Sequence, residues 1–432
     1  IRGHIQNING KYNSNTLISN QVSGDANIDF VTGAGGAISI STEAIVDEIS
    51  GIFTNNFVKS SSKQSTKTIA DGGAISIDSD TVVNRVKDSL FSNNKVYVES
   101  KNGITTAQGG AVYNTGNLEK IQNSNFVGNS VVVKSSSDDI TTQGGAIYTT
   151  KDLNIVADNG QSVFRGNYTE ENGKRDDNAI YADNAATINF QALNKGRIDM
   201  YDNIRGSEGY TVNITGDGSG TFGMYNNIYD ANVTIGNTNL NTVNNLTHTY
   251  NFNSLTLTGD VNATLDVDLA KAEMDKFTAD SYGEHKGNLN VIAMNLLSDA
   301  NEDNTQILFA QQGLKDFVSS DVKNVAYSPI YKYTVNYDNR DDAGYFVFTR
   351  GAGSSNNQSD AFNPSVLSAP VSSVAASQTT INETFKYVFE HADAFTQMPL
   401  HIRNAKMNAN KYAISTDFNH NLGSLCPEHN NK

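Results

Sequence analysis

The chain has 432 residues, with 31 Lys and Arg against 46 Asp and Glu, which gives a net charge of -15. This balance argues against a nucleic-acid partner, a single Cys rules out a disulfide framework, and 38% hydrophobic residues exceed what a disordered acidic tail contains. The sequence opens at Ile1 without a signal sequence, and no run of about 18 apolar residues occurs. We therefore expect an export signal to have been removed and no transmembrane helix to be present.

A glycine-containing tetrapeptide recurs in the first part of the chain. Its copies start 37, 37 and 35 residues apart (35 to 72 to 109 to 144), and Asp177-Asn178-Ala179-Ile180 is a degenerate fifth copy. The four complete copies are Gly35-Gly36-Ala37-Ile38, Gly72-Gly73-Ala74-Ile75, Gly109-Gly110-Ala111-Val112 and Gly144-Gly145-Ala146-Ile147.

A second tetrapeptide, Phe-x-x-Asn, is interleaved with the first. It starts 18, 19, 17 and 20 residues after successive glycine motifs, and Tyr12-Asn13-Ser14-Asn15 is its first copy. The first and fourth residues of its four other copies are Phe53 and Asn56, Phe91 and Asn94, Phe126 and Asn129, and Phe164 and Asn167.

The even alternation of the two motifs predicts a structural unit of about 18 residues. This length is too short for two helices and fits one turn of a β-solenoid. Runs of period two beside the motifs, such as Ala37-Ile38-Ser39-Ile40, agree with short strands separated by turns. We predict some ten turns over the first 190 residues, which at about 4.8 Å per turn would extend roughly 45–50 Å.

Each motif has a mechanical interpretation. Paired glycines permit a corner with positive φ and a close approach of two backbones. The Phe side chains would stack from turn to turn inside the core. The Asn three residues later would occupy a bend, adopt the left-handed conformation and bond to its equivalents in a ladder.

The alternating GGA(I/L/V) and FxxN motifs resemble the passenger repeats of chlamydial-type polymorphic membrane proteins, which are autotransporter adhesins. The resemblance covers roughly residues 12–182. It implies a right-handed parallel β-helix that is exported across the outer membrane by a C-terminal β-barrel and adheres to host cells through its repeats. The sequence departs from the family where Asp177 and Asn178 replace both glycines, and it lacks the cysteines that many such passengers carry.

We expect four regions. Residues 1–182 are the repeat β-helix, and residues 183–350 continue it or form an aromatic-rich cap, with a hairpin turning at Asp338–Asp342. Residues 351–379 read as a flexible linker, because Gly, Ser, Asn and Pro dominate them. Residues 380–432 begin with a T-x-x-E capping box at Thr380 and Glu383, which predicts a short helix that either enters a translocator cut short or packs on the solenoid.

No enzymatic signature emerges. The column before the glycine motif consists of Ala34, Asp71, Gln108, Gln143 and Asp176. Only one of the four complete copies has a carboxylate there, so the column forms no row of carboxylates. The seven His are scattered, which predicts no metal site, and no cofactor motif is present.

The leading hypothesis is therefore a surface-displayed or secreted bacterial adhesin, with no catalytic residues and no cofactor. Its partner would be a host-cell surface protein or glycan, bound by the β-helix face and by the loops 59–63 and 134–138. A C-terminal β-barrel that this sequence does not contain would hold it at the outer membrane. Both a monomer and a homo-oligomer are left open. The rival interpretations are a β-helix polysaccharide lyase or hydrolase, and a passive structural stalk.

Overall fold

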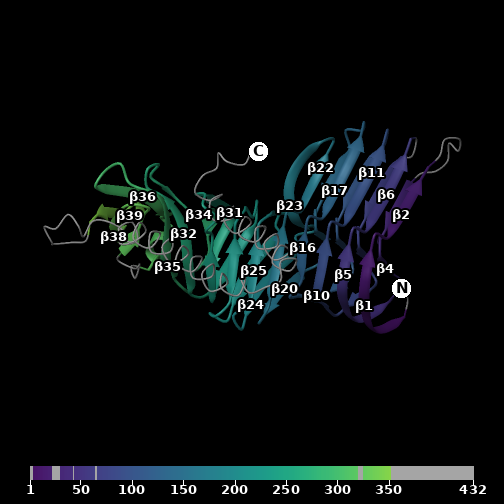
Figure 1. Cartoon of the computed structure of the whole chain (residues 1–432), viewed down its shortest axis with the longest axis horizontal. Coiled ribbons are helices and arrows are strands. Elements are labelled where there is room, and N and C mark those ends of the chain that lie inside the picture. Colours follow the sequence, from purple (N-terminus) through teal and green to yellow (C-terminus); the bar gives the residue numbers. More distant parts are fainter. Residues whose placement is uncertain (1–2, 22–29, 42, 64–65, 320–324, 352–432) are drawn as a thin grey trace, which may run out of the picture. The chain divides into compact units, whose positions relative to one another are not determined.

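A computed structural model describes residues 3–21, 30–41, 43–63, 66–319 and 325–351 (Figure 1). The chain divides into two compact units, residues 1–362 and 363–432, and every described residue belongs to the first. The described residues are nearly all β, and their one helical turn is the 3-10 helix η1 (Lys315–Phe317). The predicted linker beyond Gly351 and the predicted helix at 380–432 lie outside the described residues.

The repeat region is a stack of coils, in which each strand pairs in parallel with the equivalent strand of the next coil. The predicted parallel β-helix is thereby confirmed. Up to residue 182 the coils are β1 (His4–Asn13), β2 (Thr16–Asn20), β3 (Phe30–Ala34) and β4 (Ile38–Ile40); β5 (Ile45–Thr54), β6 (Phe57–Ser62), β7 (Lys67–Asp71) and β8 (Ile75–Ile77); β9 (Val82–Val83), β10 (Val86–Ser92), β11 (Lys95–Ser100), β12 (Ile104–Gln108) and β13 (Val112–Asn114); β14 (Asn117–Leu118), β15 (Ile121–Gln122), β16 (Asn125–Val127), β17 (Ser130–Ser135), β18 (Ile140–Gln143) and β19 (Ile147–Thr149); and β20 (Leu153–Asp158), β21 (Gln161–Arg165), β22 (Tyr168–Glu171) and β23 (Lys174–Ala182).

The predicted 18-residue turn is wrong. Phe53 pairs with Phe91, and Phe91 pairs with Phe126, so one coil takes 38 and then 35 residues (53 to 91 to 126) and carries one copy of each motif. The coils therefore number half of the predicted turns. The physical reason is that the chain leaves the coil after each Phe motif and returns to it at the next glycine motif.

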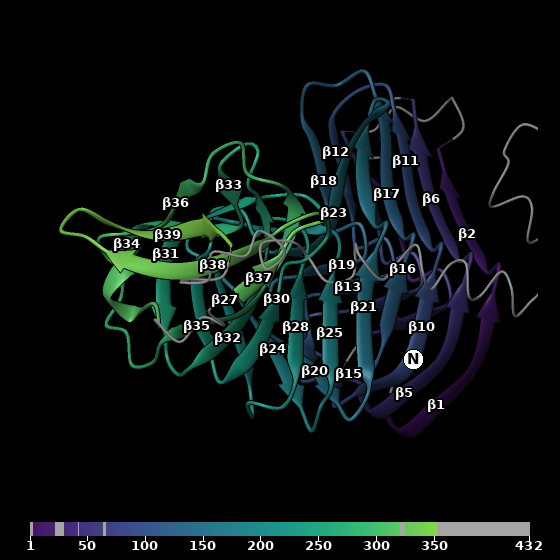
Figure 2. The same cartoon turned by 60° about the vertical axis from the view of Figure 1, so that its left-hand side comes forward.

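This excursion builds a two-layer extension, which we call the flange (Figure 2). One layer consists of β2, β6, β11, β17 and β22, and the other of β3, β7, β12 and β18. The flange has a small core of its own, separate from the main core of the coils. Its buried residues are Val58, Ala70, Val96, Val98, Ala107, Val131 and Val133.

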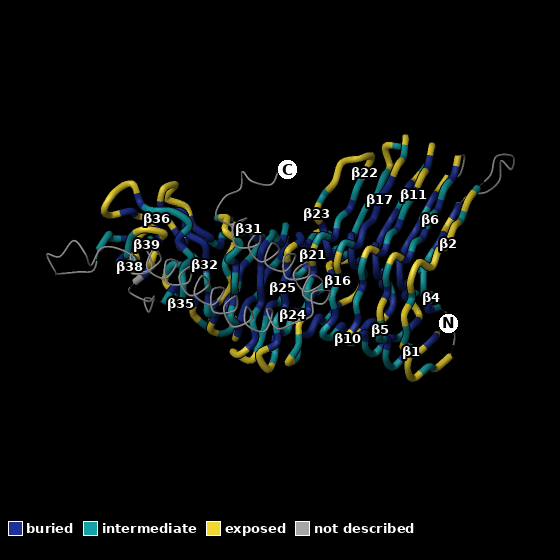
Figure 3. The backbone as a smooth tube through the Cα atoms, in the orientation of Figure 1, coloured by how far each residue is buried: buried dark blue, intermediate teal, exposed yellow. Residues whose placement is uncertain are grey.

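The main core lies between the strands that carry the Phe motif and those that follow the glycine motif. It continues without a break from the first coils into the last described strands, and burial alternates along the strands while the turns are exposed (Figure 3). Period-two patterns place one face of a strand inside, as Ile38 and Ile40 illustrate in β4.

Beyond residue 182 the coils continue without a flange and become shorter. Thr187 pairs with Thr211 and Thr211 with Asn232, which are spacings of 24 and 21 residues (187 to 211 to 232). The strands are β24 (Thr187–Leu193), β25 (Arg197–Met200), β26 (Asn203–Gly206), β27 (Thr211–Gly216), β28 (Thr221–Met224), β29 (Asn232–Gly236), β30 (Thr238–Asn241), β31 (Thr249–Leu257), β32 (Val261–Asp268), β33 (Glu273–Met274), β34 (Lys276–Tyr282) and β35 (Leu289–Ser298).

A four-stranded antiparallel sheet follows the coils. It consists of β36 (Asn304–Gln311), β37 (Val325–Tyr327), β38 (Lys332–Asn339) and β39 (Ala343–Arg350). The expected hairpin is formed by β38 and β39, which turn at residues 340–342. The aromatic residues Phe309, Phe346 and Phe348 are buried in the same core as the coils, so this sheet packs onto the solenoid.

Candidate functional site

The asparagines that end the Phe motif form a hydrogen-bonded row through the interior. The side-chain nitrogen of Asn94 donates to the side-chain oxygen of Asn129 at 2.9 Å, and that of Asn129 donates to Asn167 at 2.9 Å. Each side-chain nitrogen also donates to a backbone carbonyl of the preceding coil, as Asn94 does to Phe53 at 2.9 Å. Because these side chains are fully buried, the row satisfies polar groups that would otherwise destabilise the corner.

The aromatic residues of the same motif stack above one another. Ring centroids of successive members are 4.7 to 4.9 Å apart and the rings are within 4 to 6° of parallel, for Tyr12, Phe53, Phe91, Phe126 and Phe164. Parallel pairing in register brings identical side chains together and thereby produces the stack.

The expected left-handed conformation of the fourth residue of this motif is wrong. The positive φ falls on the third residue instead, at 55° in Asn55 and 54° in Asn93, with glycine at the same place in Gly128 and Gly166. The fourth residue, whose side chain belongs to the hydrogen-bonded row, does not have a positive φ.

The paired glycines form the neck through which the chain returns from the flange. Gly72 has φ of +61°, and a Cβ at Gly73 would overlap the carbonyl oxygen of Gly110 and lie 2.8 Å from the backbone nitrogen of Lys95. Lys95 is the residue that follows Asn94 into the flange. The two motifs therefore meet at the neck, where two segments of backbone pass too closely for any side chain.

The degenerate fifth copy lies where the flange ends. There β22 and β23 form an antiparallel hairpin, in which Tyr168 is opposite Asp177. No further flange strand stacks beyond this hairpin among the described residues. Asp177 and Asn178 therefore replace the glycines at the one neck over which no later flange coil passes.

The 24 predicted motif residues are consequently internal. All are buried except Gly35, Gly36 and Ala37 of the first copy, which are half-buried. The motif side chains position the surface, and a partner would meet other residues.

The outer face of the flange carries aromatic and cationic side chains. The rings of Phe57 and Tyr97 are 6.5 Å apart, and the ammonium groups of Lys59 and Lys95 lie 5.3 and 5.5 Å from the centroid of the Tyr97 ring. Ile18 on the neighbouring strand is 54% exposed. The predicted binding loops 59–63 and 134–138 both lie at the outer end of this flange, in β6 and in and after β17.

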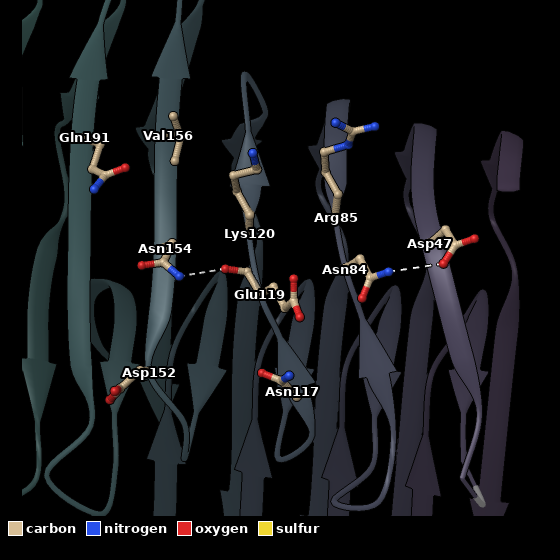
Figure 4. Close-up of a pocket in the computed structure, with 10 residues that line it drawn as sticks. All are labelled: Asp47, Asn84, Arg85, Asn117, Glu119, Lys120, Asp152, Asn154, Val156 and Gln191. Carbon is tan, nitrogen blue, oxygen red and sulfur yellow. Dashed lines mark hydrogen bonds between the residues drawn. The ribbon is translucent and has the colours of Figure 1, made fainter. Parts of the chain in front are cut away.

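A second surface feature is a trough on the outer face of the sheet that carries the Phe motif (Figure 4). Its volume is about 860 Å³, and it crosses strands of five successive coils. Sequence reasoning missed it, because its residues lie outside both motifs. They are Asp47, Asn84, Arg85, Asn117, Glu119, Lys120, Asp152, Asn154, Val156 and Gln191.

Carboxylates occur in the trough, but the described residues hold no metal centre. No three His, Cys, Asp or Glu side chains gather around a common point in the part of the chain that the structure describes.

Asp71, in the column before the paired glycines, is a buried carboxylic acid. It is 8% exposed, and burial raises its pKa to about 8. Its Oδ1 has no hydrogen-bond partner among the described residues. Its coil neighbours are Ala34 and Gln108, and the side-chain nitrogen of Gln108 donates to Gln143 of the next coil at 2.6 Å.

These features define a parallel β-solenoid whose repeated motifs build interior ladders and a neck. Residues 88–115, which contain one copy of each motif, match the Chlamydia polymorphic membrane protein repeat. The chain thus resembles the chlamydial polymorphic membrane proteins. Members of this family are generally non-enzymatic proteins of the outer membrane and cell surface. A search of curated protein sequences found no match. No helix within the described residues is both long and apolar enough to cross a bilayer.

Proposed function

We propose that the protein is an autotransporter passenger that acts as an adhesin at the bacterial surface and binds a host-cell or matrix receptor through its flange. The match to a polymorphic membrane protein repeat supports the surface setting. The observation that carries the proposal is the flange itself. The first two coils after residue 182 close in 24 and 21 residues without one, so the additional chain in the earlier coils is not needed to close the core.

The outer face of the flange has the chemistry of a protein interface. Aromatic and arginine side chains contribute most binding energy at such interfaces. The described face presents Tyr97 and Phe57, and the guanidinium of Arg175 lies 4.1 Å from the centroid of the Tyr168 ring. These side chains are fixed on strands, so little conformational entropy is lost when a partner binds.

Binding of the full chain to epithelial cells, measured by flow cytometry, tests this proposal. We expect saturable binding that falls at least tenfold in the variant Phe57→Ala/Tyr97→Ala, with an unchanged circular dichroism spectrum. The matched control is Tyr327→Ala, because Tyr327 is also exposed but lies outside the flange. Absence of binding by the unaltered chain would contradict the adhesin function. Equal binding by the double variant would contradict the assignment to the flange.

A second candidate function is cleavage of a polysaccharide, because carboxylates from three coils line the trough: Asp47, Glu119 and Asp152. Glycoside hydrolysis requires two carboxyl groups that flank the bond to be broken. Release of reducing ends from polysaccharides, abolished by Glu119→Gln, is the result that this candidate predicts.

A further inference from the structure

The trough combines a groove with polar groups that the protein itself does not use. The side chains of Asn117, Glu119, Lys120 and Gln191 line it, and none of them makes a hydrogen bond or an ion pair with any other described residue. Polar groups that converge on a concave surface without internal partners are typical of a ligand site.

The remaining polar side chains are partly held in place from within. Asn84 donates to the carboxylate of Asp47 at 3.1 Å, and Asn154 donates to the backbone carbonyl of Glu119 at 2.7 Å. The backbone N–H of Thr187 donates to Asp152 at 2.8 Å. These contacts restrain the side chains of Asp47, Asn84, Asn154 and Asp152, so part of the trough is organised before a ligand arrives.

The lining excludes an apolar ligand and an added β-strand. Val156 is its single apolar member, and this residue is 6% exposed. The strands beneath the trough pair with a neighbouring coil on both sides, as β20 does with β15 and β24. A peptide would therefore find neither apolar pockets for its side chains nor a free backbone edge to extend.

The charge pattern also selects the ligand. Three carboxylates lie beside two cations, and the guanidinium of Arg85 is already paired with Glu48. An anionic ligand would meet an excess of negative charge, while a polycation would meet Lys120 in the middle of the trough. Hydroxyl groups both donate and accept hydrogen bonds, so they fit a lining that alternates acceptors with ammonium and amide donors.

We infer that the trough binds an extended, uncharged oligosaccharide that lies across the coils. Five coils correspond to four spacings of about 4.8 Å, or about 19 Å, which is long enough to contact several sugar rings at once. The site is separate from the flange, so it does not rest on the adhesive role that we propose for the flange.

Isothermal titration calorimetry with the full chain tests this inference. The probes are maltohexaose and chitohexaose as uncharged hexasaccharides, the corresponding disaccharides, a sulfated heparin hexasaccharide, and hexalysine. We expect at least one uncharged hexasaccharide to bind, its disaccharide to bind at least tenfold more weakly, and the heparin fragment and hexalysine to give no binding heat.

Three double variants locate the site. Asn117→Ala/Gln191→Ala should weaken hexasaccharide binding at least fivefold, because both amides lose contact with the ligand. The matched control Asn288→Ala/Gln312→Ala removes the same two amide types from exposed positions outside the trough and should leave the affinity unchanged. The flange variant Phe57→Ala/Tyr97→Ala should also leave it unchanged, which separates this test from that of the adhesin.

Three results would overturn the inference. They are failure of both uncharged hexasaccharides to bind, tighter binding of heparin or hexalysine, and an equal loss of affinity in the trough and control variants. A chain that binds cells but no hexasaccharide would retain the adhesin proposal and reject only the trough.

Discussion

The side-chain amide of Asn167 donates a hydrogen bond of 2.7 Å to the carboxylate of Asp202, and with this bond the row of asparagines ends. The same carboxylate accepts the backbone N–H groups of Gly166 at 2.7 Å and Asn167 at 2.9 Å. A carboxylate only accepts, so it completes the bonds of the coil before it and has no amide hydrogen to pass to the next coil. The row therefore stops one coil after the flange does.

Removal of one member of the row should destabilise the solenoid. Asn129→Ala deletes bonds to Asn94, Asn167 and the carbonyl of Phe91, and it leaves buried donors and acceptors unpaired. We expect a loss of about 2–4 kcal/mol in the free energy of unfolding, measured by urea denaturation. Asn9→Ala, at an exposed position of β1, is the control, and an equal effect of both variants would contradict a structural role for the row.

The neck should reject even one methyl group. Gly110→Ala places a Cβ 2.7 Å from the backbone nitrogen of Ser130 and into the carbonyl oxygen of Gly145, although the φ of Gly110 is not in the left-handed region. We expect a loss of more than about 3 kcal/mol or failure to fold, measured by thermal unfolding.

The control for the neck is Gly173→Ala. Gly173 has φ of +86° but no atom within 4 Å of an added Cβ, so its substitution should cost only about 1 kcal/mol of backbone strain. If Gly110→Ala is tolerated as well as Gly173→Ala, the backbones do not approach as closely as the neck requires.

Asp71 should make stability depend on pH. Burial raises its folded pKa to about 8 from an ordinary value of 3.8, so between pH 4 and pH 8 the folded state binds more protons than the unfolded state. Its contribution to stability is fully present below pH 4 and is lost as the pH rises to 8. Asp71→Asn removes the ionisable group. The difference in free energy of unfolding between the variant and the unaltered chain should therefore shift in favour of the variant by at least about 2 kcal/mol when the pH is raised from 4.5 to 8.5.

Urea denaturation at both pH values measures this difference. Glu208→Gln, at an exposed position, should show no such change. A difference between Asp71→Asn and the unaltered chain that does not vary with pH would show that Asp71 stays ionised in the folded protein.

The flange should open independently of the main core. Its core is a small, separate cluster, so β11 and β17 should exchange their amide hydrogens faster than β10 and β16. Val98→Ala removes two buried methyl equivalents, worth about 1.5 kcal/mol, and should speed exchange in the flange strands about tenfold without affecting β10 and β16. Uniform acceleration along the whole chain would mean that flange and coils unfold together.

The interior of this fold could be predicted from the sequence because register places identical residues together. The recurrence of Phe53, Phe91 and Phe126 predicted a stack, and their rings do stack. The turn length was misjudged because the glycine motif falls almost midway between successive Phe residues. Since a ladder requires like residues in equivalent positions, the distance between identical motifs, and not between alternating ones, measures the coil.

The flange and the trough could not be predicted in the same way. The alternation of Val96 and Val98 is typical of a strand with one buried face, yet nothing local shows that this face turns away from the main core. The trough residues Asp47, Asn84, Glu119 and Asn154 differ in type, although their spacings of 37, 35 and 35 residues (47 to 84 to 119 to 154) follow the repeat. A concave surface arises where several strands bend together, so no sequence pattern within a single strand predicts it.

The neck has a consequence for how the sequence can vary. The paired glycines pack against the point where the following coil departs, as Gly73 does against Lys95. In each flange coil the chain departs after Asn56, Asn94 or Asn129 and returns at the next paired glycines. Residues inserted or deleted between them change the reach of the projection without shifting any ladder inside the stack. The coils therefore cannot tolerate a one-residue shift in register, whereas the length of the flange strands and loops can vary.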